Sequence, residues 1–513
     1  MDSLRSNTKW VSSTLLNDII THSETYRGMI NTIFTVPTSF TMDFNYVIYY
    51  YMNQEKGNVT NDEKELIILR NAVDKIESNM GSRLLKSAPV VEIIQILEEF
   101  LRKKRLICYG GTAINNILPH HSRFYNKDVE LPDYDFFSPT PIKDVKELAD
   151  IYARAGFIEI EAKSGMHHGT YKLYVNFMPI ADITYLIPEI FNSIKKQAIR
   201  IDGIMYAPPD YLRMSMYLEL SRPRGDVSRW EKVLKRLMLL NKHYPLKRLK
   251  CGNEFSRGYE GTQDPRLIYN TIRDTASNQG LVLFGGFAMD LYKKYFPKTK
   301  YIVFAENNPD FDILSDDPHK AATIIKERLA QEGITGIKII KKAAIGELIS
   351  VHYEIIVDED TVAFIYEPNA CHSYNTVNIN GRKLNVASID TMLSMYMAFS
   401  YIDRPYYNRD RIMCMANYLF DVQMRNRFKQ EGLLKRFGSQ CYGYQTTLED
   451  IRSLKSKKFR ELSKNDDQYE EWFMKYSPRG VNKTRRNSRT SSTKKASRTK
   501  KPSKSKKVSR KSR

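Results

Sequence analysis

The chain repeats itself, and this repetition restricts its fold more than any other feature. Residues 109–113 (YGGTA) recur as residues 284–288 (FGGFA), 175 positions further along. Residues 132–138 (PDYDFFS) recur as residues 309–315 (PDFDILS), at an offset of 177. Three shorter matches follow in the same order: residues 201–203 with 379–381, 215–217 with 394–396, and 222–223 with 404–405. Ordered matches at a nearly constant offset predict a tandem duplication of one domain.

Each copy combines helical and strand patterns. In the first copy, apolar residues at helical spacing predict helices, and short apolar or alternating runs predict strands. The predicted helices cover residues 92–104, 112–118 and 148–155, and the predicted strands cover residues 105–109, 133–137, 170–177 and 180–186. Such a unit packs helices on a mixed sheet, so the predicted fold class is α+β, with two tandem α/β units.

The regions outside the two copies differ from them in composition. The N-terminal region is Tyr-rich with a mostly helical pattern, and residues 406–476 are again helical and charged. Residues 479–513 hold 16 Lys or Arg and no Asp or Glu, so this tail carries most of the net charge of +21 and is expected to be disordered. The predicted division is a helical N-terminal region (1–100), a first α/β domain (101–250), a second α/β domain with C-terminal helices (251–478) and the basic tail (479–513).

Several classes of protein are not expected from this sequence. The N-terminus lacks a basic region followed by an apolar stretch, and no run of about 18 apolar residues exists, so neither a signal peptide nor a membrane span is predicted. The five cysteines are odd in number and far apart, which favours a reducing compartment. The adjacent histidines at 120–121 and 167–168 cannot both face one metal from a regular element, so zinc is not expected.

Three carboxylates fall on two predicted strands of the first copy. Asp133 and Asp135 are two residues apart, so their side chains point to the same side of a strand. Asp182 lies within an apolar strand segment. Carboxylates gathered on one sheet face repel each other unless a cation neutralises them, and a ligand set of oxygens alone suits Mg²⁺ or Mn²⁺. These three residues are therefore the predicted catalytic and metal-binding residues.

A glycine pair stands where the first predicted strand passes into a helix. Gly110 and Gly111 allow the backbone to approach a phosphate near a helix N-terminus. Taken alone, a glycine pair is usually a turn, and Asp-x-Asp is common on exposed strands. The ordered set of strand, glycine pair, helix, Asp-x-Asp and third Asp indicates phosphoryl or nucleotidyl transfer.

Together these residues resemble the signature of the DNA polymerase β-like nucleotidyltransferase superfamily. The layout of residues 1–478 resembles the poly(A) polymerase catalytic subunit of poxviruses and giant DNA viruses, and the basic tail favours a giant-virus member. The resemblance implies template-independent, primer-dependent addition of AMP from ATP to RNA 3′ ends by a two-metal mechanism. Asp133 and Asp135 would bind both metals and Asp182 only one.

The same resemblance implies further contacts and partners. Gly110, Gly111 and Thr112 would contact the β- and γ-phosphates of ATP. The acceptor would be single-stranded RNA, the 3′ end of an mRNA. A homodimer or a separate processivity partner is expected, with no membrane. The implied location is the virion and the host cytoplasm, in a virus factory.

The second copy lacks part of the carboxylate set. Alignment places Phe364 where the first copy has Asp182, although Asp310 and Asp312 are kept. Glu367 falls on the opposite sheet face, and Glu354 belongs to the preceding strand. We therefore predict a catalytically silent copy that shapes the RNA path or an oligomer interface.

Some alternatives stay open on the residues alone. A nucleotidyltransferase with another acceptor (CCA addition, oligoadenylate synthesis or antibiotic modification) would share the site, and a non-catalytic RNA-binding scaffold would share the charge. The tail would raise RNA affinity in a salt-dependent way, act as a nuclear-type address or help packaging. Candidates for base stacking or phosphate contact are Lys195, Lys196, Tyr211, Arg224 and Lys232.

Overall fold

The computed structural model describes residues 61–85, 87–126, 131–246, 251, 257–296, 308–379 and 381–478. The predictions for residues 1–60 and for the basic tail lie outside these residues. The chain separates into two compact units, one of residues 1–87 and 126–131 and the other of residues 88–125 and 132–513. The described part of the first unit is chiefly one helix, α3 (Asn61–Leu85).

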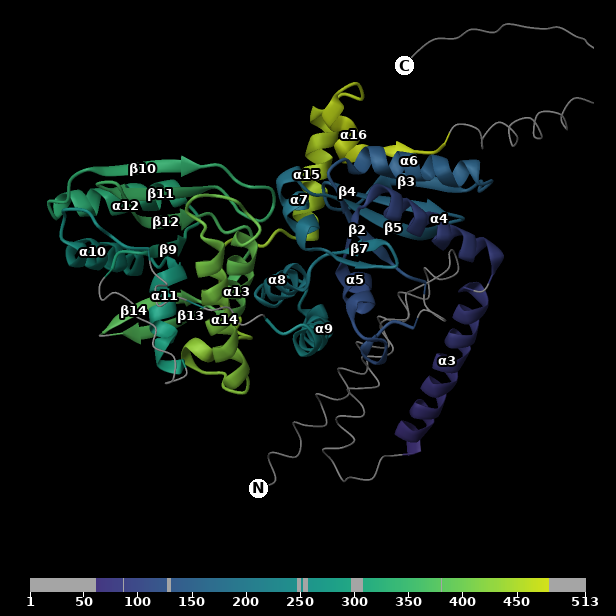
Figure 1. The fold of residues 1–513 in the computed structure, drawn as a ribbon, viewed down its shortest axis with the longest axis horizontal. Helices are drawn as coiled ribbons and strands as arrows, with labels where there is room; N and C mark the ends of the chain where they lie inside the picture. The colour runs from purple at the N-terminus through teal and green to yellow at the C-terminus, as the bar shows by residue number, and fades with distance from the viewer. Residues whose placement is uncertain are drawn as a thin grey trace, which may run out of the picture. The chain divides into compact units, whose positions relative to one another are not determined.

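The second unit contains two eight-stranded sheets built on one plan (Figure 1). The first sheet has the strand order β16-β3-β4-β5-β2-β1-β7-β6. Its strands are β1 (Ile107–Tyr109), β2 (Tyr134–Ser138), β3 (Ile160–Ser164), β4 (Thr170–Val175), β5 (Met178–Tyr185), β6 (Ile199–Ile201), β7 (Ile204–Tyr206) and β16 (Lys475–Tyr476). The pairs β2–β5 and β1–β7 are parallel, and the other pairs are antiparallel.

The second sheet repeats this order as β10-β11-β12-β9-β8-β14-β13, with β15 added at its other edge. Its strands are β8 (Val282–Phe284), β9 (Phe311–Leu314), β10 (Ile337–Lys342), β11 (His352–Val357), β12 (Asp360–Tyr366), β13 (His372–Ile379), β14 (Arg382–Ala387) and β15 (Cys441–Tyr442). The parallel pairs are again the equivalent ones, β9–β12 and β8–β14. The predicted α+β fold with tandem copies is confirmed.

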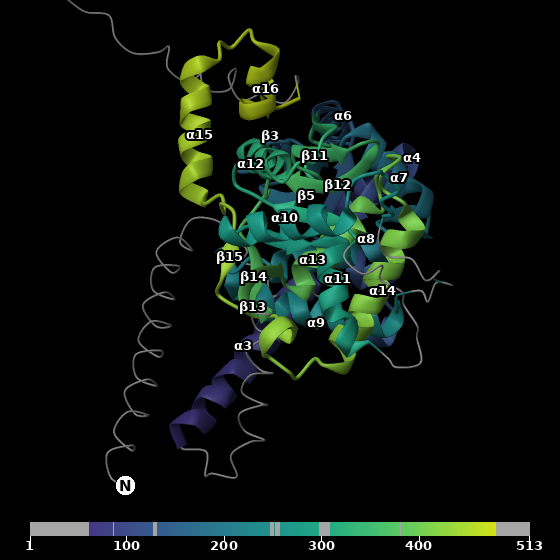
Figure 2. The same ribbon diagram turned by 90° about the vertical axis from the view of Figure 1, so that its left-hand side faces the viewer.

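Helices cover the sheets in both copies (Figures 1 and 2). Many of them start with proline in the first turn, where a missing N–H costs no hydrogen bond. In the first copy they are α4 (Ala88–Lys104), α5 (Gly110–Ile117), α6 (Pro141–Arg154), α7 (Pro188–Gln197), α8 (Pro209–Leu220) and α9 (Trp230–His243). In the second copy they are α10 (Pro265–Asn278), α11 (Gly285–Tyr292), α12 (Pro318–Gln331), α13 (Ile389–Phe399) and α14 (Arg409–Arg425).

The two copies pack against each other through the equivalent helices α8 and α13. The Tyr217 hydroxyl on α8 donates a hydrogen bond to Gln423 Oε1 on α14 at 2.8 Å. Near the surface, Arg404 forms a two-pronged ion pair with Glu189, with N–O distances of 2.7 and 3.1 Å. Buried apolar residues of both copies form one continuous cluster, so the duplicated domains share a core.

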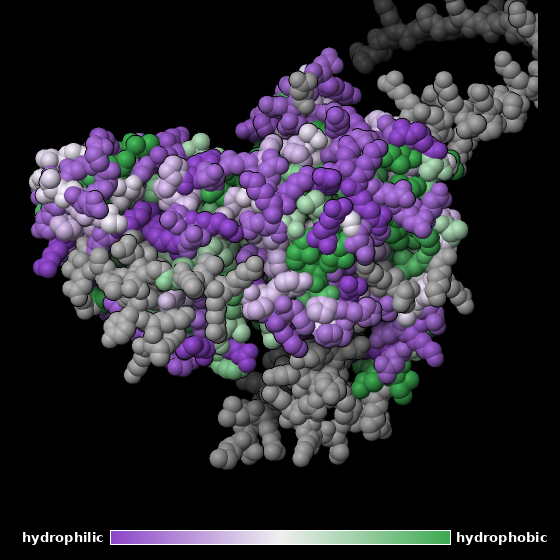
Figure 3. All heavy atoms as spheres, viewed as in Figure 1, coloured by the Kyte–Doolittle hydropathy of each residue, from purple (hydrophilic) through white to green (hydrophobic). Residues whose placement is uncertain are grey.

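The last described residues return to the first sheet. After α14 the chain forms α15 (Leu448–Glu461) and α16 (Asp467–Phe473), and β16 then pairs with the edge strand β3. Ser164 Oγ and the Tyr171 hydroxyl donate hydrogen bonds to the Trp472 and Glu471 carbonyls, at 2.8 and 3.1 Å. Figure 2 shows α15 and α16 beside β3, and Figure 3 shows hydrophilic residues gathered over them. We call residues 448–476 the C-terminal strap.

Several sequence predictions need correction. The predicted helix at residues 92–104 begins at Ala88, and the helix at residues 148–155 begins at Pro141. The short strands β3, β6 and β7 were not predicted at all. Two disulfides pair four of the five cysteines, Cys251 with Cys414 and Cys371 with Cys441, which the wide spacing in sequence concealed. Among the described residues, no helix is long and apolar enough to cross a membrane.

Candidate active site

Two adjacent parallel strands bring the predicted carboxylates together. Asp135 on β2 and Asp182 on β5 are direct register neighbours, so their side chains share a sheet face. Asp133 directly precedes β2, two residues before Asp135. The β-strand alternation expected from the sequence therefore holds, and the third carboxylate joins the first two across the sheet.

The electrostatics of this cluster show that the charges are crowded. Burial raises the pKa of Asp135 to about 8, and the negative charges of Asp133 and Asp182 add to the shift. Asp133 keeps contact with solvent, but desolvation by neighbouring atoms and the charge of Asp182 raise its pKa, while Lys172 and Lys232 lower it. Mutual repulsion at a half-buried place is what a bound cation relieves.

A lysine lies against one member of the cluster. Lys172 on β4 is the cross-strand neighbour of Asp182, and its Nζ lies 2.5 Å from Asp182 Oδ2. Among the described residues, no three His, Cys, Asp or Glu side chains are arranged as a metal-ligand group. The oxygen-only donor set, whose repulsion Lys172 relieves only in part, nevertheless fits a hard divalent cation such as Mg²⁺.

The glycine pair approaches this cluster closely. Gly110 adopts a φ of +71°, and a Cβ added to it would lie 2.6 Å from Asp135 Oδ2. Both glycines begin α5, whose N-terminus has no side-chain cap. The Thr112 hydroxyl, which we predicted to contact a phosphate, donates a hydrogen bond to the Asp133 carbonyl at 2.5 Å. Thr112 therefore fixes the start of β2 against α5.

Replacement of Gly110 by alanine should damage the site while leaving the fold largely intact. The left-handed backbone costs alanine about 1–2 kcal/mol, and the new Cβ must displace the Asp135 carboxylate. Misplacement of a reacting group by about 1 Å can cost roughly 100-fold in rate, so we expect a loss of that order in nucleotide transfer.

The matched control for this change is Gly156→Ala. Gly156 has a φ of +97° but nothing within 4 Å of an added Cβ, so it incurs the backbone cost alone. Thermal melting and transfer rates should be measured for both variants. Equal activities of the two variants would show that the approach of Gly110 to Asp135 is unimportant.

A basic helix faces the glycine turn. Arg236 on α9 donates a hydrogen bond to the Tyr125 hydroxyl at 2.7 Å, and its guanidinium lies 4.9 Å from the ring centre of Phe124. A Cβ on Gly111 would meet both Tyr125 Oη (2.7 Å) and Arg236 Nη1 (3.1 Å). Lys232, one helical turn before Arg236, is close enough to lower the pKa of Asp133. Positive charge thus lies where a phosphate would meet the turn.

The other basic and aromatic candidates have different places. Tyr211 is buried in α8 and packs edge-on against Phe137, so it belongs to the core. Lys195 and Lys196 lie in the last turn of α7, and Arg224 lies in the loop after α8. Of the candidates proposed from sequence, Lys232 is the one whose charge acts on the carboxylates. Sequence reasoning missed Lys172 and Arg236, because their roles depend on which strand and helix lie opposite.

In the second copy an arginine lies against the two remaining carboxylates. Phe364 on β12 is the register neighbour of Asp312 on β9, as Asp182 is of Asp135, so the predicted loss of the third carboxylate is seen in the strand pairing. Arg257 Nη2 lies 2.5 Å from Asp310 Oδ1 and 3.6 Å from Asp312 Oδ1. Its guanidinium also lies 4.7 Å from the Phe364 ring centre. A built-in cation therefore neutralises the two remaining carboxylates.

The predicted substitutes for the third carboxylate do not restore it. Glu354 is the cross-strand neighbour of Phe364 on β11. Its carboxylate pairs with Lys342 at 2.9 Å and accepts a hydrogen bond from Thr361. Glu354 is therefore already partnered within its own sheet.

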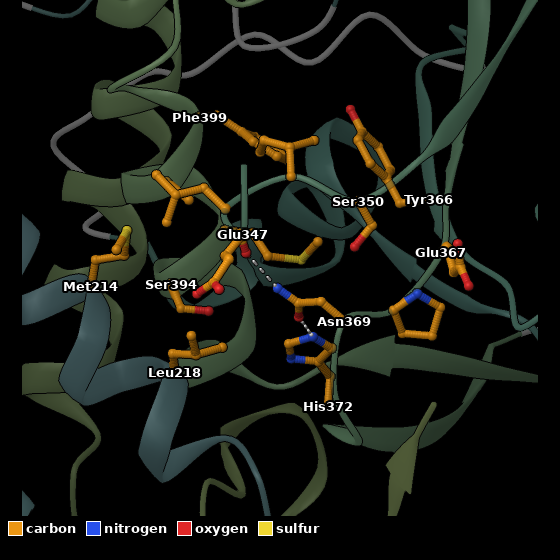
Figure 4. A pocket seen from close by; sticks show the side chains of 15 residues that line it. Met214, Leu218, Glu347, Ser350, Tyr366, Glu367, Asn369, His372, Ser394 and Phe399 are labelled. Carbon is orange, nitrogen blue, oxygen red and sulfur yellow. Dashed lines mark hydrogen bonds between the residues drawn. The ribbon is translucent and has the colours of Figure 1, made fainter. Parts of the chain in front are cut away.

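A separate cavity lies between the copies, away from the strands that carry the carboxylates (Figure 4). Its walls come from α8, α13, β12 and the loop at residues 347–350. His372 Nε2 lies 2.7 Å from Asn369 Oδ1, and Asn369 Nδ2 donates to the Glu347 carbonyl at 3.3 Å. None of the predicted site residues lines this cavity.

The described residues bring the glycine turn and the predicted carboxylates together in the first copy. Residues 95–226, which contain the glycine pair and all three carboxylates, match the profile of the poly(A) polymerase catalytic subunit family. The predicted resemblance to these viral proteins is confirmed over that segment.

Individual relatives agree with this assignment. A protein named poly(A) polymerase catalytic subunit from Acanthamoeba polyphaga mimivirus is 29% identical over 258 residues, 49% of this chain and 43% of the relative. One so named from African swine fever virus (strain Badajoz 1971 Vero-adapted) is 36% identical over 170 residues, 31% of this chain and 35% of the relative. The chain thus spans less than half the length of these two relatives.

A solved structure extends the likeness in fold to most of the chain. The crystal structure of the Megavirus polyadenylate synthase is similar with a TM-score of 0.68, covering 79% of this chain and 85% of that one. The sequence identity is 18%, so this likeness concerns the fold.

Proposed function

We propose that the chain adds AMP from ATP to the 3′ ends of RNA, without a template and on an existing primer. The observation that carries the proposal is the meeting of Asp133, Asp135 and Asp182 beside the Gly110 turn, in the first copy only. The family match over the same segment supports it.

The carboxylates would hold the divalent cations, Mg²⁺ or Mn²⁺. Bound there, two cations would lower the pKa of the RNA 3′-hydroxyl and stabilise the charge that develops on the phosphates. Asp133 and Asp135 would contribute to both positions, and Asp182 to the one nearer the primer. Thr112 holds the Asp133 backbone in place, so the ligand geometry is set before substrate arrives.

The triphosphate of ATP would lie over the start of α5. Gly110 and Gly111 have no side chain to block its approach, and the uncapped N–H groups of α5 favour negative charge. Arg236 and Lys232 on α9 would supply positive charge from the opposite side. Arg236 is held by Tyr125, so its position is preset.

The second copy would take no part in the chemistry. Arg257 fills the space between its carboxylates, which leaves this domain a role in shaping the RNA path or an assembly interface. A homodimer or processivity partner, and a location in the virion and host cytoplasm, belong to the same proposal. A silent scaffold does not explain why Lys172 relieves only part of the repulsion among the carboxylates of the first copy. A nucleotidyltransferase with another acceptor would share this site, so the products of the reaction must distinguish it.

The test is extension of a labelled oligonucleotide RNA. The full-length protein is incubated with Mg²⁺ and each NTP in turn, and the products are separated on a gel. We expect a ladder of products with ATP, none after removal of the metal with EDTA, and none without primer. Extension that requires a CCA-type sequence, or products formed on small acceptors, would assign another acceptor, and no transfer with any NTP would support the scaffold.

A further inference from the structure

A row of lysines crosses the first sheet from the candidate active site to the sheet edge. Starting at Asp182 on β5, the register neighbours are Lys172 on β4, Lys163 on β3 and Lys475 on β16. Three strand spacings separate Asp182 from Lys475, about 14 Å. We call Lys172, Lys163 and Lys475 the lysine row.

The lysine row lies on one solvent-facing side of the sheet. Along β4, Tyr171 and Leu173 are buried, while Lys172 between them is half-exposed. Lys163 alternates in the same way with the buried Ala162 on β3, and Lys475 is the most exposed of the three lysines. Direct cross-strand neighbours point to the same side, so the three ammonium groups follow one line.

The C-terminal strap supplies the last member of the row. Without β16, β3 would be the sheet edge and the row would end at Lys163. Lys475 stands four residues before Arg479, where the basic tail begins in the sequence. The row therefore extends from the carboxylates to β16, the last strand that the structure describes.

The second copy shows that the lysines are not needed by the architecture. The equivalent register line runs from Phe364 on β12 to Glu354 on β11 and Ile340 on β10. Among the described residues, β10 is the outermost strand on that side, so the second sheet has no counterpart of Lys475. Two tandem copies with the same strand order thus differ in charge along this line.

The row keeps a positive charge despite its ion pairs. One carboxylate, Glu161, lies between two lysines, 3.1 Å from Lys163 Nζ and 3.0 Å from Lys475 Nζ. One negative charge cannot neutralise both, and half-exposed ion pairs of this kind contribute only about 0–1 kcal/mol, so a phosphate can replace them. The Tyr174 ring lies 4.3 Å from Lys163 Nζ and offers an aromatic face beside the row.

We infer that the lysine row binds the phosphates of the RNA strand being extended, upstream of its 3′ end. The inference rests on the proposed function and names the path of the primer across the first sheet. The strand would enter over β16 and β3 and place its 3′ end at Asp182. Single-stranded RNA fits because its phosphates are regularly spaced and its bases can stack on Tyr174.

The direct test measures RNA binding without catalysis. Binding of a fluorescent oligonucleotide RNA to full-length protein is titrated between 0.1 and 1 M salt, for the wild type and for Lys163→Ala/Lys475→Ala. Each phosphate contact on a single strand contributes about 0.7 to the slope of log affinity against log salt, so the double variant should lose about 1.4 in slope. Its affinity should fall roughly 25-fold at 0.1 M and converge with the wild type near 1 M.

A matched control lies on the equivalent strand of the second copy. Lys338 on β10 is exposed and pairs with Glu359 at 3.1 Å, as Lys163 pairs with Glu161. Lys338→Ala should leave the slope unchanged. If both variants lose the same amount of slope, the effect comes from the net charge of the protein and not from the lysine row, and the inference is wrong.

A second variant predicts a gain rather than a loss. Glu161→Gln removes the competing carboxylate while keeping its size, so RNA should bind about fivefold more tightly at 0.1 M salt. Unchanged or weaker binding would contradict the path.

Primer length separates this inference from the proposed function. In AMP transfer, Lys163→Ala/Lys475→Ala should raise the apparent KM for long primers. The apparent KM for a dinucleotide primer should not change, because a dinucleotide cannot span about 14 Å. If the double variant transfers AMP normally and binds RNA with unaltered affinity, the lysine row does not bind the primer, and the proposed function is unaffected. If the wild-type protein transfers no nucleotide but the double variant binds RNA more weakly, the proposed enzymatic function is wrong and the RNA-binding role of the lysine row stands.

Discussion

Asp182→Asn is expected to lower the rate of AMP transfer by about 100- to 1,000-fold, the usual cost of losing one group that stabilises developing charge. The asparagine keeps the size of the side chain but removes one of the three charges that would hold cations beside the primer. It also leaves Lys172 without the ion pair that it forms at 2.5 Å. Single-turnover incorporation at saturating ATP and RNA measures the effect directly.

The matched control is Asp312→Asn in the second copy. Asp312 is the counterpart of Asp135, but it faces Phe364 and Arg257 and contributes no charge to the first site. Transfer by this variant should stay within about twofold of the wild type at 20 °C, even if the protein melts at a lower temperature. Transfer that depends on Asp312 and survives loss of Asp182 would place the chemistry in the second copy and contradict the prediction.

The parts of the fold and site that could be read from the sequence share one property: their signal is local. The glycine pair, the Asp-x-Asp strand and the third Asp each occur within a few residues, and the repeat displays all of them twice. The alignment of Phe364 with Asp182 also agrees with the strand pairing, because Phe364 pairs with Asp312 as Asp182 pairs with Asp135.

The parts that were missed depend on partners distant in the chain. Arg257 reaches carboxylates more than 50 residues away, and the C-terminal strap reaches β3 across about 300 residues. Cys251 pairs with Cys414 across 163 residues, a disulfide that the odd number and wide spacing of the cysteines did not predict. No periodicity records such pairings, since they arise only when the sheets and their covering helices assemble.

The two copies meet the same electrostatic problem in different ways. Each places an Asp-x-Asp pair beside a glycine turn, where a Cβ on Gly110 or Gly285 would strike the facing aspartate. In the second copy a guanidinium neutralises the pair permanently. In the first, the repulsion is only partly relieved by Lys172, which is consistent with a site that takes its cations from solution.

Arg257→Met should therefore be strongly destabilising. The guanidinium side chain is largely buried, and its removal would leave the Asp310 and Asp312 carboxylates facing each other, with Arg411 3.6 Å from Asp310 as the remaining ion-pair partner among the described residues. Loss of one partner of a buried ion pair costs about 3–5 kcal/mol, because the remaining charge is uncompensated. Thermal and denaturant melting should show the change.

The destabilisation should shrink as the pH falls. Burial raises the pKa of Asp312 to about 6 even beside Arg257, and loss of the arginine should raise it further. A carboxyl whose pKa is higher in the folded than in the unfolded state binds more protons when folded, so lowering the pH from 7.5 to 5 favours the folded form. Arg257→Met should thus recover part of its lost stability at pH 5.

Two companion variants decide whether charge is the cause. Arg452→Met removes an exposed arginine that pairs with Glu449 at 3.5 Å, and should cost less than about 1 kcal/mol. Arg257→Met/Asp310→Asn/Asp312→Asn removes the guanidinium and both carboxylates and should regain most of the stability, since neither carboxylate charge is left buried without its cation. If the triple variant is as unstable as Arg257→Met, the arginine acts through its packing on Phe364 and not as the cation of the second copy.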